Sequence, residues 1–317
     1  MLNFCSYFDK NYLSKFLVLR ESLIKLSCRH NFYVLALDDF TYQFLNKNNF
    51  NNIIICHVKE LEKKYHELKR IKSTRNLIEY YFTLSPYMPI FFNKKFNLKK
   101  LNYLDVDILF FKNPKLFYDK LNNYSIVLIK QNYKEKYGLF NVGWISYNFL
   151  NPDTKNILND WKLKCINWCY DKVDKNLYAD QKYLDYWPSL SKDLISVEPK
   201  YSMISPWDKI IPTSTKNRNN FFSYHFQGLK FSKNYFISGK SIYYFNFHRK
   251  LVKKFYIKYI NLLKEKQNQY DLKFTDTKNL RSNLEIKKNL FTKVINLIKK
   301  VKFYLFAILR MDFYNLR

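Results

Sequence analysis

The sequence predicts an α/β fold in which a mostly parallel sheet is covered by helices. Segments typical of strands alternate with segments of helical periodicity through the first hundred residues. Hydrophobic residues make up 47% and aromatic residues 20% of the 317 residues, so a sizeable core can form. With 4 Gly, 8 Pro and no internal repeat, the chain lacks the pattern of a solenoid or a low-complexity protein.

The first half of the chain has the order of a nucleotide-binding sheet. A helix over 12–26 connects the first two predicted strands, and the strands themselves are residues 2–8, 31–39 and 51–58. In such sheets ligands bind outside the carboxyl ends of the strands. Asp9 follows the first strand and Asp38 the second, so we expect them to hold the base or ribose of a nucleotide.

The later elements complete one predicted domain over residues 1–248. A helix over 72–92 carries Arg75 and is closed by Pro86 and Pro89. Further strands are predicted at 101–111, 125–130 and 140–148, and an amphipathic helix at 154–173. Residues 249–317 form a second, Lys-rich helical region. There the segment 286–309 has one apolar face and an opposing Lys-rich face, which favours an anionic membrane surface, or else packing on the domain or on a partner subunit.

The charge is strongly basic, with 55 Lys and Arg against 26 Asp and Glu. A net positive charge of this size is typical of proteins that bind nucleic acid, an anionic membrane or a phosphorylated substrate. The rival explanation is the residue usage of an AT-rich genome, with Lys on solvated faces. Five Cys lack zinc-type spacing, and Cys165 and Cys169 are expected to pack in the core as reduced thiols. Without a signal-like or spanning apolar segment, we expect a cytoplasmic protein, peripheral on the inner face of the cytoplasmic membrane.

Asp105 and Asp107 lie two positions apart in the apolar run LNYLDVDILFF. Two carboxylates cannot stay ionised in a dry core, so they lie at the mouth of the strand or hold a cation. Mg²⁺ and Mn²⁺ take oxygen ligands, commonly carboxylates together with substrate phosphates. The pair therefore predicts a divalent cation that binds a diphosphate.

These residues resemble those of GT-A-type, nucleotide-sugar-dependent glycosyltransferases, and in particular the retaining family-eight group of glycogenin and the lipooligosaccharide galactosyltransferases. YLDVD is similar to their metal-binding motif. Three further segments follow in the family order over residues 3 to 230, namely FNVGWISYN at 140–148, ADQKYLDYW at 179–187 and YHFQGLK at 224–230. The resemblance implies a GT-A-like fold, with a Rossmann-like nucleotide-binding half and a mixed central sheet.

The resemblance also implies roles for single residues. His225 would be the third metal ligand, and Gly228 and Lys230 would contact the diphosphate. Apart from the resemblance, Arg75 is expected on a phosphate oxygen, because its planar guanidinium matches an oxyanion. Asn141 would lie by the donor sugar, and Asp180 and Gln181 by its anomeric carbon. The implied activity is a metal-dependent transfer, with Mn²⁺ or Mg²⁺, from a UDP-sugar with retained configuration. The basic C-terminal segment 286–309 in turn leads us to expect a glycan or lipid-linked acceptor in surface polysaccharide synthesis.

Each of these residues has a structural alternative. His225 could be a core histidine, and Asp180 with Gln181 the start of a helix. Asn141 could lie in a bulged strand, and Arg75 could pair with Glu79. For the whole protein, a nucleic-acid-binding function finds no recognition module. A metal-dependent nucleotidyltransferase would need a Gly-rich phosphate loop, which 4 Gly argue against.

Overall fold

The computed structural model describes residues 1–208, 220–232, 234–239 and 249–272. Closer to the C-terminus it also describes residues 298, 301–302, 304–305, 307–309 and 312–316. The chain forms two compact units. The first comprises Met1–Ile204 with Asn220–His225, and the second Ser205–Asn219 with Phe226–Arg317. The boundary predicted after residue 248 stays a prediction.

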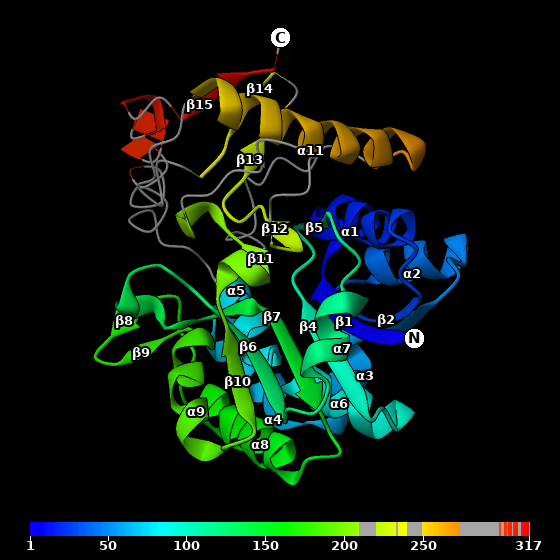
Figure 1. Ribbon diagram of the computed structural model, residues 1–317, viewed down its shortest axis with the longest axis vertical. Helices are drawn as coiled ribbons and strands as arrows, with labels where there is room; N and C mark the ends of the chain where they lie inside the picture. Colours follow the sequence, from blue (N-terminus) through cyan, green and yellow to red (C-terminus); the bar gives the residue numbers. More distant parts are fainter. Residues whose placement is uncertain are drawn as a thin grey trace. The chain divides into compact units, whose positions relative to one another are not determined.

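A seven-stranded mixed sheet forms the centre of the first unit, with the strand order β10-β6-β7-β4-β1-β2-β3 (Figure 1). Strand β7 runs antiparallel to β4 and β6, and the other neighbouring pairs are parallel. The α/β fold with a mixed sheet is thus confirmed. The strands are β1 Leu2–Phe8, β2 His30–Ala36, β3 Ile53–His57, β4 Lys100–Leu104, β6 Ile126–Lys130, β7 Phe140–Asn148 and β10 Leu194–Val197.

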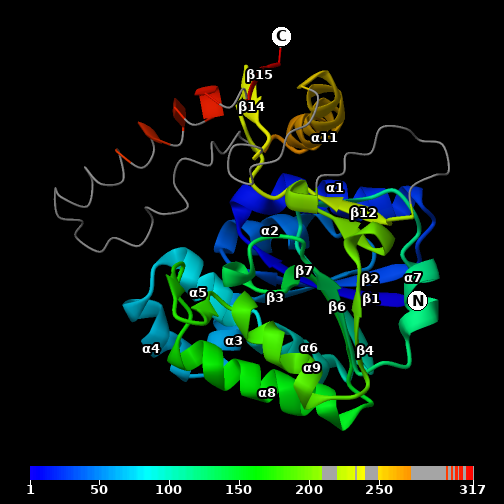
Figure 2. The same ribbon diagram turned by 60° about the vertical axis from the view of Figure 1, so that its left-hand side comes forward.

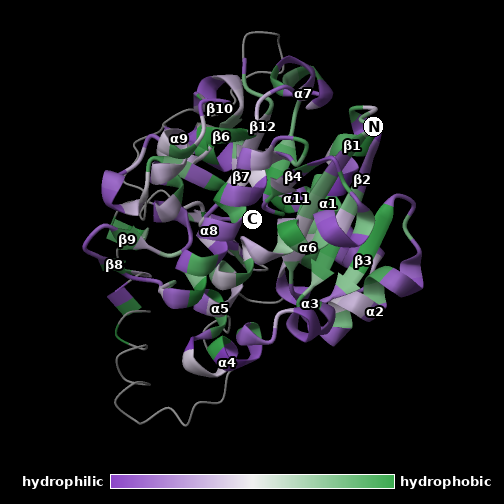
Figure 3. Ribbon diagram, turned by 90° about the horizontal axis from the view of Figure 1, so that it is seen from below, coloured by the Kyte–Doolittle hydropathy of each residue, from purple (hydrophilic) through white to green (hydrophobic). Residues whose placement is uncertain are grey.

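Helices cover both faces of this sheet, with α1 and α2 on one side and α3, α6 and α8 on the other (Figure 2). Phe32 of β2 packs on Phe16 of α1 at 5.2 Å, and the next residue, Tyr33, packs on Phe92 of α6 at 5.9 Å. Because both faces are buried, β1 to β3 are mostly hydrophobic (Figure 3). The helices are α1 Leu13–Lys25, α2 Asp39–Asn48, α3 Val58–Lys64, α4 Glu67–Thr74, α5 Leu77–Leu84, α6 Tyr87–Phe96, α7 Lys115–Leu121, α8 Pro152–Asn167 and α9 Trp187–Leu190.

The helix predicted over 72–92 is instead three helices, α4, α5 and α6. The first break lies at Asn76, whose side chain accepts a 3.0 Å hydrogen bond from the amide of Glu79. Glu79 in turn accepts from the amide of Asn76 at 3.0 Å, so the two residues form a capping box. The second break lies at Ser85 and Pro86, because proline cannot donate to the preceding turn.

A second, smaller sheet contains β11 Met203–Ile204, β12 Ser223–His225 and β5 Ile108–Phe110, and all three strands follow β4 in the sequence. Strand β12 pairs antiparallel with β5, with His225 opposite Ile108. This register brings a late segment of the chain beside the loop that follows β4. The remaining short elements of this unit are β8 Val173–Asp174, β9 Leu177–Tyr178, η1 Lys10–Tyr12, η2 Glu135–Tyr137, η3 Gln181–Tyr186 and η4 Pro199–Tyr201.

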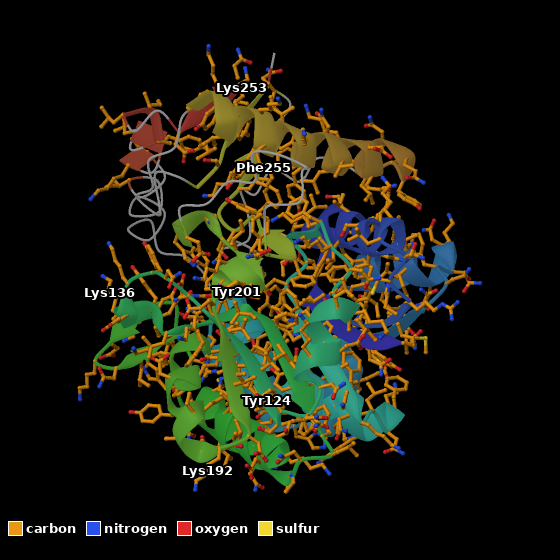
Figure 4. All side chains as sticks on the ribbon, in the orientation of Figure 1. Tyr124, Lys136, Lys192, Tyr201, Lys253 and Phe255 are labelled. Atoms are coloured by element: carbon orange, nitrogen blue, oxygen red, sulfur yellow. The ribbon has the colours of Figure 1, made fainter. Side chains whose placement is uncertain are left out.

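The second unit has an aromatic core of its own. Phe226 stacks on Tyr259 with ring centroids 3.8 Å apart, and Phe236 stacks on Tyr314 at 4.7 Å. On α11, Phe255 is buried and Lys253 partly exposed (Figure 4). None of the helices in the described ranges combines the length and hydrophobicity that a membrane crossing requires. The elements of the second unit are η5 Pro206–Asp208, β13 Lys230–Phe231, β14 Tyr235–Ile237, α11 Arg249–Gln269 and β15 Phe313–Asn315.

Candidate metal and nucleotide-sugar site

Asp105 and Asp107 lie in the turn between β4 and β5, not within a strand. Strand β4 ends at Leu104, and the amide of Asp105 donates a 2.8 Å hydrogen bond to the carbonyl of Gly143 in β7. The turn places both carboxylates at the edge of the sheet where β4 ends. This is the position expected from the cost of burying two uncompensated carboxylates.

His225 completes a cluster with the two aspartates. Its Nε2 atom lies 3.0 Å from Asp107 Oδ1 and 3.5 Å from Asp105 Oδ2. One ligand atom from each of the three residues lies within 4.8 Å of the others. The pairing of β12 with β5 explains this, because His225 stands opposite Ile108, next to Asp107. Two carboxylate oxygens and one imidazole nitrogen are donors that Mn²⁺ accepts, so these residues fit a divalent cation.

Two further side chains hold the carboxylates. The Tyr103 hydroxyl donates a 2.5 Å hydrogen bond to Asp105 Oδ1, and Lys15 Nζ lies 3.4 Å from Asp107 Oδ2. Sequence reasoning missed both residues. Alternation in β4 places Tyr103 on the same side as Asp105, and Lys15 is a cation in the first turn of α1, where the helix dipole is unfavourable. These were the signals that could have found them.

The charges of the cluster depend on one another. Burial raises the pKa of Asp105, and His225 opposes that rise only in part. Burial would also raise the pKa of Asp107, but Lys15 and His225 together hold it well below its ordinary value. For His225 burial acts to lower the pKa, yet the two aspartates raise it above its usual value. Without a bound cation the imidazole is therefore stabilised as an imidazolium.

Asn141 and Gly143 lie against this cluster. The Gly143 amide donates a 2.8 Å hydrogen bond to Asn141 Oδ1. A Cβ atom at position 143 would meet Asn141 Oδ1, Asp105 Oδ2 and His225 Cε1, each at 3.0 Å. The structure thus brings Asn141 together with the predicted metal ligands. It also gives a steric reason for glycine at position 143.

Asp180 is buried, and Gln181 is partly buried beside β7. Gln181 donates to the Tyr137 carbonyl at 2.7 Å and accepts from the Val142 amide at 3.4 Å. Asp180 precedes η3, but its carboxyl makes no capping hydrogen bond, which speaks against the helix-start explanation. Burial raises the pKa of Asp180 to about 7, and a hydrogen bond from Ser85 opposes this.

Asp9 and Asp38 stand at the ends of β1 and β2, as predicted, and the amide of Lys10 links their loops. This amide donates a 2.8 Å hydrogen bond to Asp38 Oδ2. Asp38 also caps α2 by accepting from the Thr41 amide at 2.6 Å. Burial raises the pKa of Asp9, which accepts a 3.4 Å hydrogen bond from the Tyr81 hydroxyl. That Asp9 and Asp38 hold the base or ribose of a nucleotide remains a prediction.

Arg75 finds no support as a phosphate ligand. Its side chain is buried, and the guanidinium donates to the carbonyl of Cys165 at 2.7 Å, to the carbonyl of Ile166 at 2.8 Å and to the hydroxyl of Thr83. These contacts tie α5 to the end of α8. These are the contacts of a helix-packing residue, and the predicted phosphate contact of Arg75 stays a prediction. Arg75 does not form the suggested pair with Glu79, whose carboxylate caps α5 instead.

Gly228 and Lys230 belong to the second unit. Gly228 has a φ of +81°, in the region that favours glycine, and Lys230 begins β13. Their contact with a diphosphate remains a prediction. Cys165 and Cys169 are buried and free, as predicted. The segment 286–309 falls largely outside the described residues.

The comparisons with known proteins bear on the fold. No protein-family model matches the sequence. The uncharacterized protein YfnF of Bacillus subtilis strain 168 is 24% identical over 219 residues, which cover 65% of this chain and 71% of YfnF. Mouse xyloside xylosyltransferase 1 is similar in structure with a TM-score of 0.51 and 13% identity, over 72% of this chain and 98% of that one. The chain has a GT-A-type fold.

A further solved structure, the galactosyltransferase LgtC in complex with donor and acceptor sugar analogs, matches with a TM-score of 0.45 and 17% identity. The match covers 72% of this chain and 87% of that chain.

Proposed function

We propose that this protein is a metal-dependent glycosyltransferase that uses a nucleotide sugar, with UDP as the nucleotide. The observation that carries the proposal is the convergence of Asp105 Oδ2, Asp107 Oδ1 and His225 Nε2 within 4.8 Å, at the carboxyl end of β4 in a GT-A-type fold. These residues would hold Mn²⁺ or Mg²⁺. When bound, the cation neutralises charge on the departing diphosphate.

The other residues of the site have distinct proposed roles. Asn141 orients the donor sugar, because its side chain lies against the same glycine as Asp105 and His225. Asp180 and Gln181 flank the reacting carbon, and a carboxylate there would stabilise oxocarbenium character and favour retained configuration. Asp9 and Asp38 hold the nucleoside at the ends of the neighbouring strands β1 and β2, while Gly228 and Lys230 contact the diphosphate.

Thermal unfolding with a panel of nucleotide sugars, each with and without Mn²⁺, tests this proposal. A specific donor should raise the melting temperature only in the presence of the cation, because a ligand stabilises the state it binds. Asp107→Ala should abolish both the shift and Mn²⁺-dependent donor hydrolysis. Asp160→Ala, which removes an exposed carboxylate on α8, is the matched control. Wild-type hydrolysis in Asp107→Ala would refute the metal role.

We further propose that the acceptor is a glycan or lipid-linked sugar of a surface polysaccharide, met at the inner face of the cytoplasmic membrane. The net charge of +29 supports attraction to anionic lipid. A set of apolar side chains near the C-terminus is exposed, and it consists of Ile298, Val301, Leu305, Ile308 and Leu309. Such side chains beside lysines are typical of a segment lying on a membrane surface.

Sedimentation with vesicles that contain phosphatidylserine tests the membrane proposal. Truncation is a poor test, because β15 pairs with β14 and Asp312 accepts a 3.1 Å hydrogen bond from the Ser238 amide. We expect the double variant Ile308→Glu with Leu309→Glu to lose vesicle binding. Leu163→Glu, at an exposed leucine of α8, should retain it. Equal binding of all three proteins would exclude this surface.

A further inference from the structure

The two carboxylates of the cluster are held in matching ways. Each uses one oxygen for a supporting side chain and presents the other to His225. Asp105 accepts from Tyr103 through Oδ1 and faces the imidazole through Oδ2, 3.5 Å away. Asp107 contacts Lys15 through Oδ2 and faces the imidazole through Oδ1, 3.0 Å away. This arrangement prepares each aspartate to give a cation a single oxygen.

The two supports differ in charge. Tyr103 is a neutral hydroxyl, whereas Lys15 is an ammonium whose side chain is only 9% exposed. A buried ammonium is costly, and its place in the first turn of α1 adds an unfavourable helix dipole. The ring of Tyr12, with its centroid 4.2 Å from Lys15 Nζ, offsets part of this cost. A neutral donor could orient Asp107 as Tyr103 orients Asp105, so the charge of Lys15 calls for its own explanation.

The charge balance supplies that explanation. When His225 is in the neutral form that can bind a cation, the two carboxylates and the ammonium among the described residues give the cluster a net charge of one negative unit. A bound divalent cation turns this into one positive unit, whereas the loaded cluster without Lys15 would be neutral. A nucleoside diphosphate is an anion, and in a partly buried site one unit of charge has a large effect on its affinity.

We infer that Lys15 sets the charge of this site, weakening the binding of the free cation and strengthening the binding of a nucleoside diphosphate to the cation-loaded protein. The inference rests on the proposed function and adds to it a residue that selects for an anionic leaving group. It also predicts an ordered preference, since the cation is held tightly only when the diphosphate is present.

Isothermal titration calorimetry on the full chain tests the inference with Mn²⁺ alone, and then with UDP added to the Mn²⁺-saturated protein. The main variant is Lys15→Gln, which keeps a hydrogen-bond donor near Asp107 and removes the charge. We expect the Kd for Mn²⁺ to fall and the Kd for UDP to rise, each by about tenfold. Lys15→Met should also lower the Kd for Mn²⁺ and raise the Kd for UDP.

Two controls separate charge from support. Lys15→Arg keeps the charge and should stay within about threefold of the wild type for both ligands. Tyr103→Phe removes the neutral support and should weaken Mn²⁺ binding, never strengthen it. Thermal unfolding of each variant verifies that it is folded.

The outcomes are distinguishable. If Lys15→Gln and Lys15→Met weaken the binding of both ligands, Lys15 only positions Asp107 and the inference is overturned, while the proposed function stands. If the wild-type protein binds neither Mn²⁺ nor UDP, the proposed function itself is refuted. Opposite shifts in the two dissociation constants would establish the role of Lys15, because a purely structural defect cannot improve cation binding.

Discussion

The amide nitrogen of Asp105 and the carbonyl oxygen of Gly143 are joined by a 2.8 Å hydrogen bond that fixes the end of β4 to β7. The contact brings position 143 close to two of the predicted metal ligands. A Cβ atom there would lie 3.0 Å from both Asp105 Oδ2 and His225 Cε1, which is tighter than ordinary packing. The geometry of the predicted metal site therefore depends on Gly143, which is not itself a predicted metal ligand.

The variant Gly143→Ala should weaken Mn²⁺ binding by at least about tenfold, because the new methyl group displaces Asp105 or His225 from its ligand position. Titration calorimetry measures the affinity, and thermal unfolding shows whether the fold persists. Val142→Ala, a change at the neighbouring residue, should leave the affinity near that of the wild type. Wild-type affinity in Gly143→Ala would contradict this prediction and show that the metal site does not depend on glycine at position 143.

Mn²⁺ affinity should fall as the pH decreases. The two aspartates raise the pKa of His225 against the effect of burial, so a proton competes with the cation for the imidazole up to a higher pH than at an ordinary histidine. A metal ligand must be unprotonated, and each proton displaced lowers the affinity by up to about tenfold per pH unit below the pKa. Titrations at pH 6 and pH 8, in buffers of different ionisation enthalpy, measure both the affinity and the proton release. A pH-independent affinity would exclude His225 as a ligand.

Asp180 should make stability depend on pH. Burial raises the folded-state pKa of this carboxyl to about 7. Its contribution is thus complete below the unfolded pKa of about 4 and is lost as the pH rises through the folded pKa. Asp180→Asn should therefore stabilise the protein relative to the wild type above pH 7, by up to about 4 kcal/mol, and the difference should shrink toward pH 4.

Chemical unfolding of Asp180→Asn at several pH values measures this difference. Asp160→Asn should show no comparable trend, because the Asp160 side chain is 41% exposed and its carboxylate pairs with Lys164 on α8. A pH-independent difference for Asp180→Asn would mean that the carboxyl is ionised throughout. If Asp180 acts as a carboxylate in transfer, the wild-type rate should increase with pH up to about pH 7.

Arg75→Met should lower the free energy of unfolding by about 2–4 kcal/mol, because it leaves the carbonyls of Cys165 and Ile166 without their charged donor. Affinity for a nucleotide sugar should not change. Arg70→Met, at an exposed arginine of α4, is the matched control and should alter neither property. A selective loss of nucleotide affinity in folded Arg75→Met would restore the phosphate role that the buried contacts argue against.

Local sequence patterns were sufficient for much of the fold. Strands β1 and β7 cover the predicted segments 2–8 and 140–148 residue for residue, because continuous apolar runs define buried strands. The break at Asn76 was missed although the Asn-x-x-Glu capping signal is present in the sequence. Tertiary context decided the rest. Nothing local distinguishes a buried arginine that packs helices from one that binds phosphate.

The candidate site shows the same division. Asp105 and Asp107 are two positions apart in sequence, and the cost of burying them was enough to place them at the mouth of a strand. The position of His225 depends on the pairing of β12 with β5, which no periodicity reveals. A lysine in the first turn of a largely apolar helix marks Lys15 as unusual, but the sequence does not show that its partner is Asp107.

The pairing of His225 with Ile108 has a consequence for the newly made chain. Both aspartates leave the ribosome long before the histidine does, and until β12 is added the two carboxylates lack their imidazole partner. A nascent protein that has not reached this point cannot assemble the three-residue cluster. Capture of the cation would therefore report that synthesis has passed β12 and that the strand has docked.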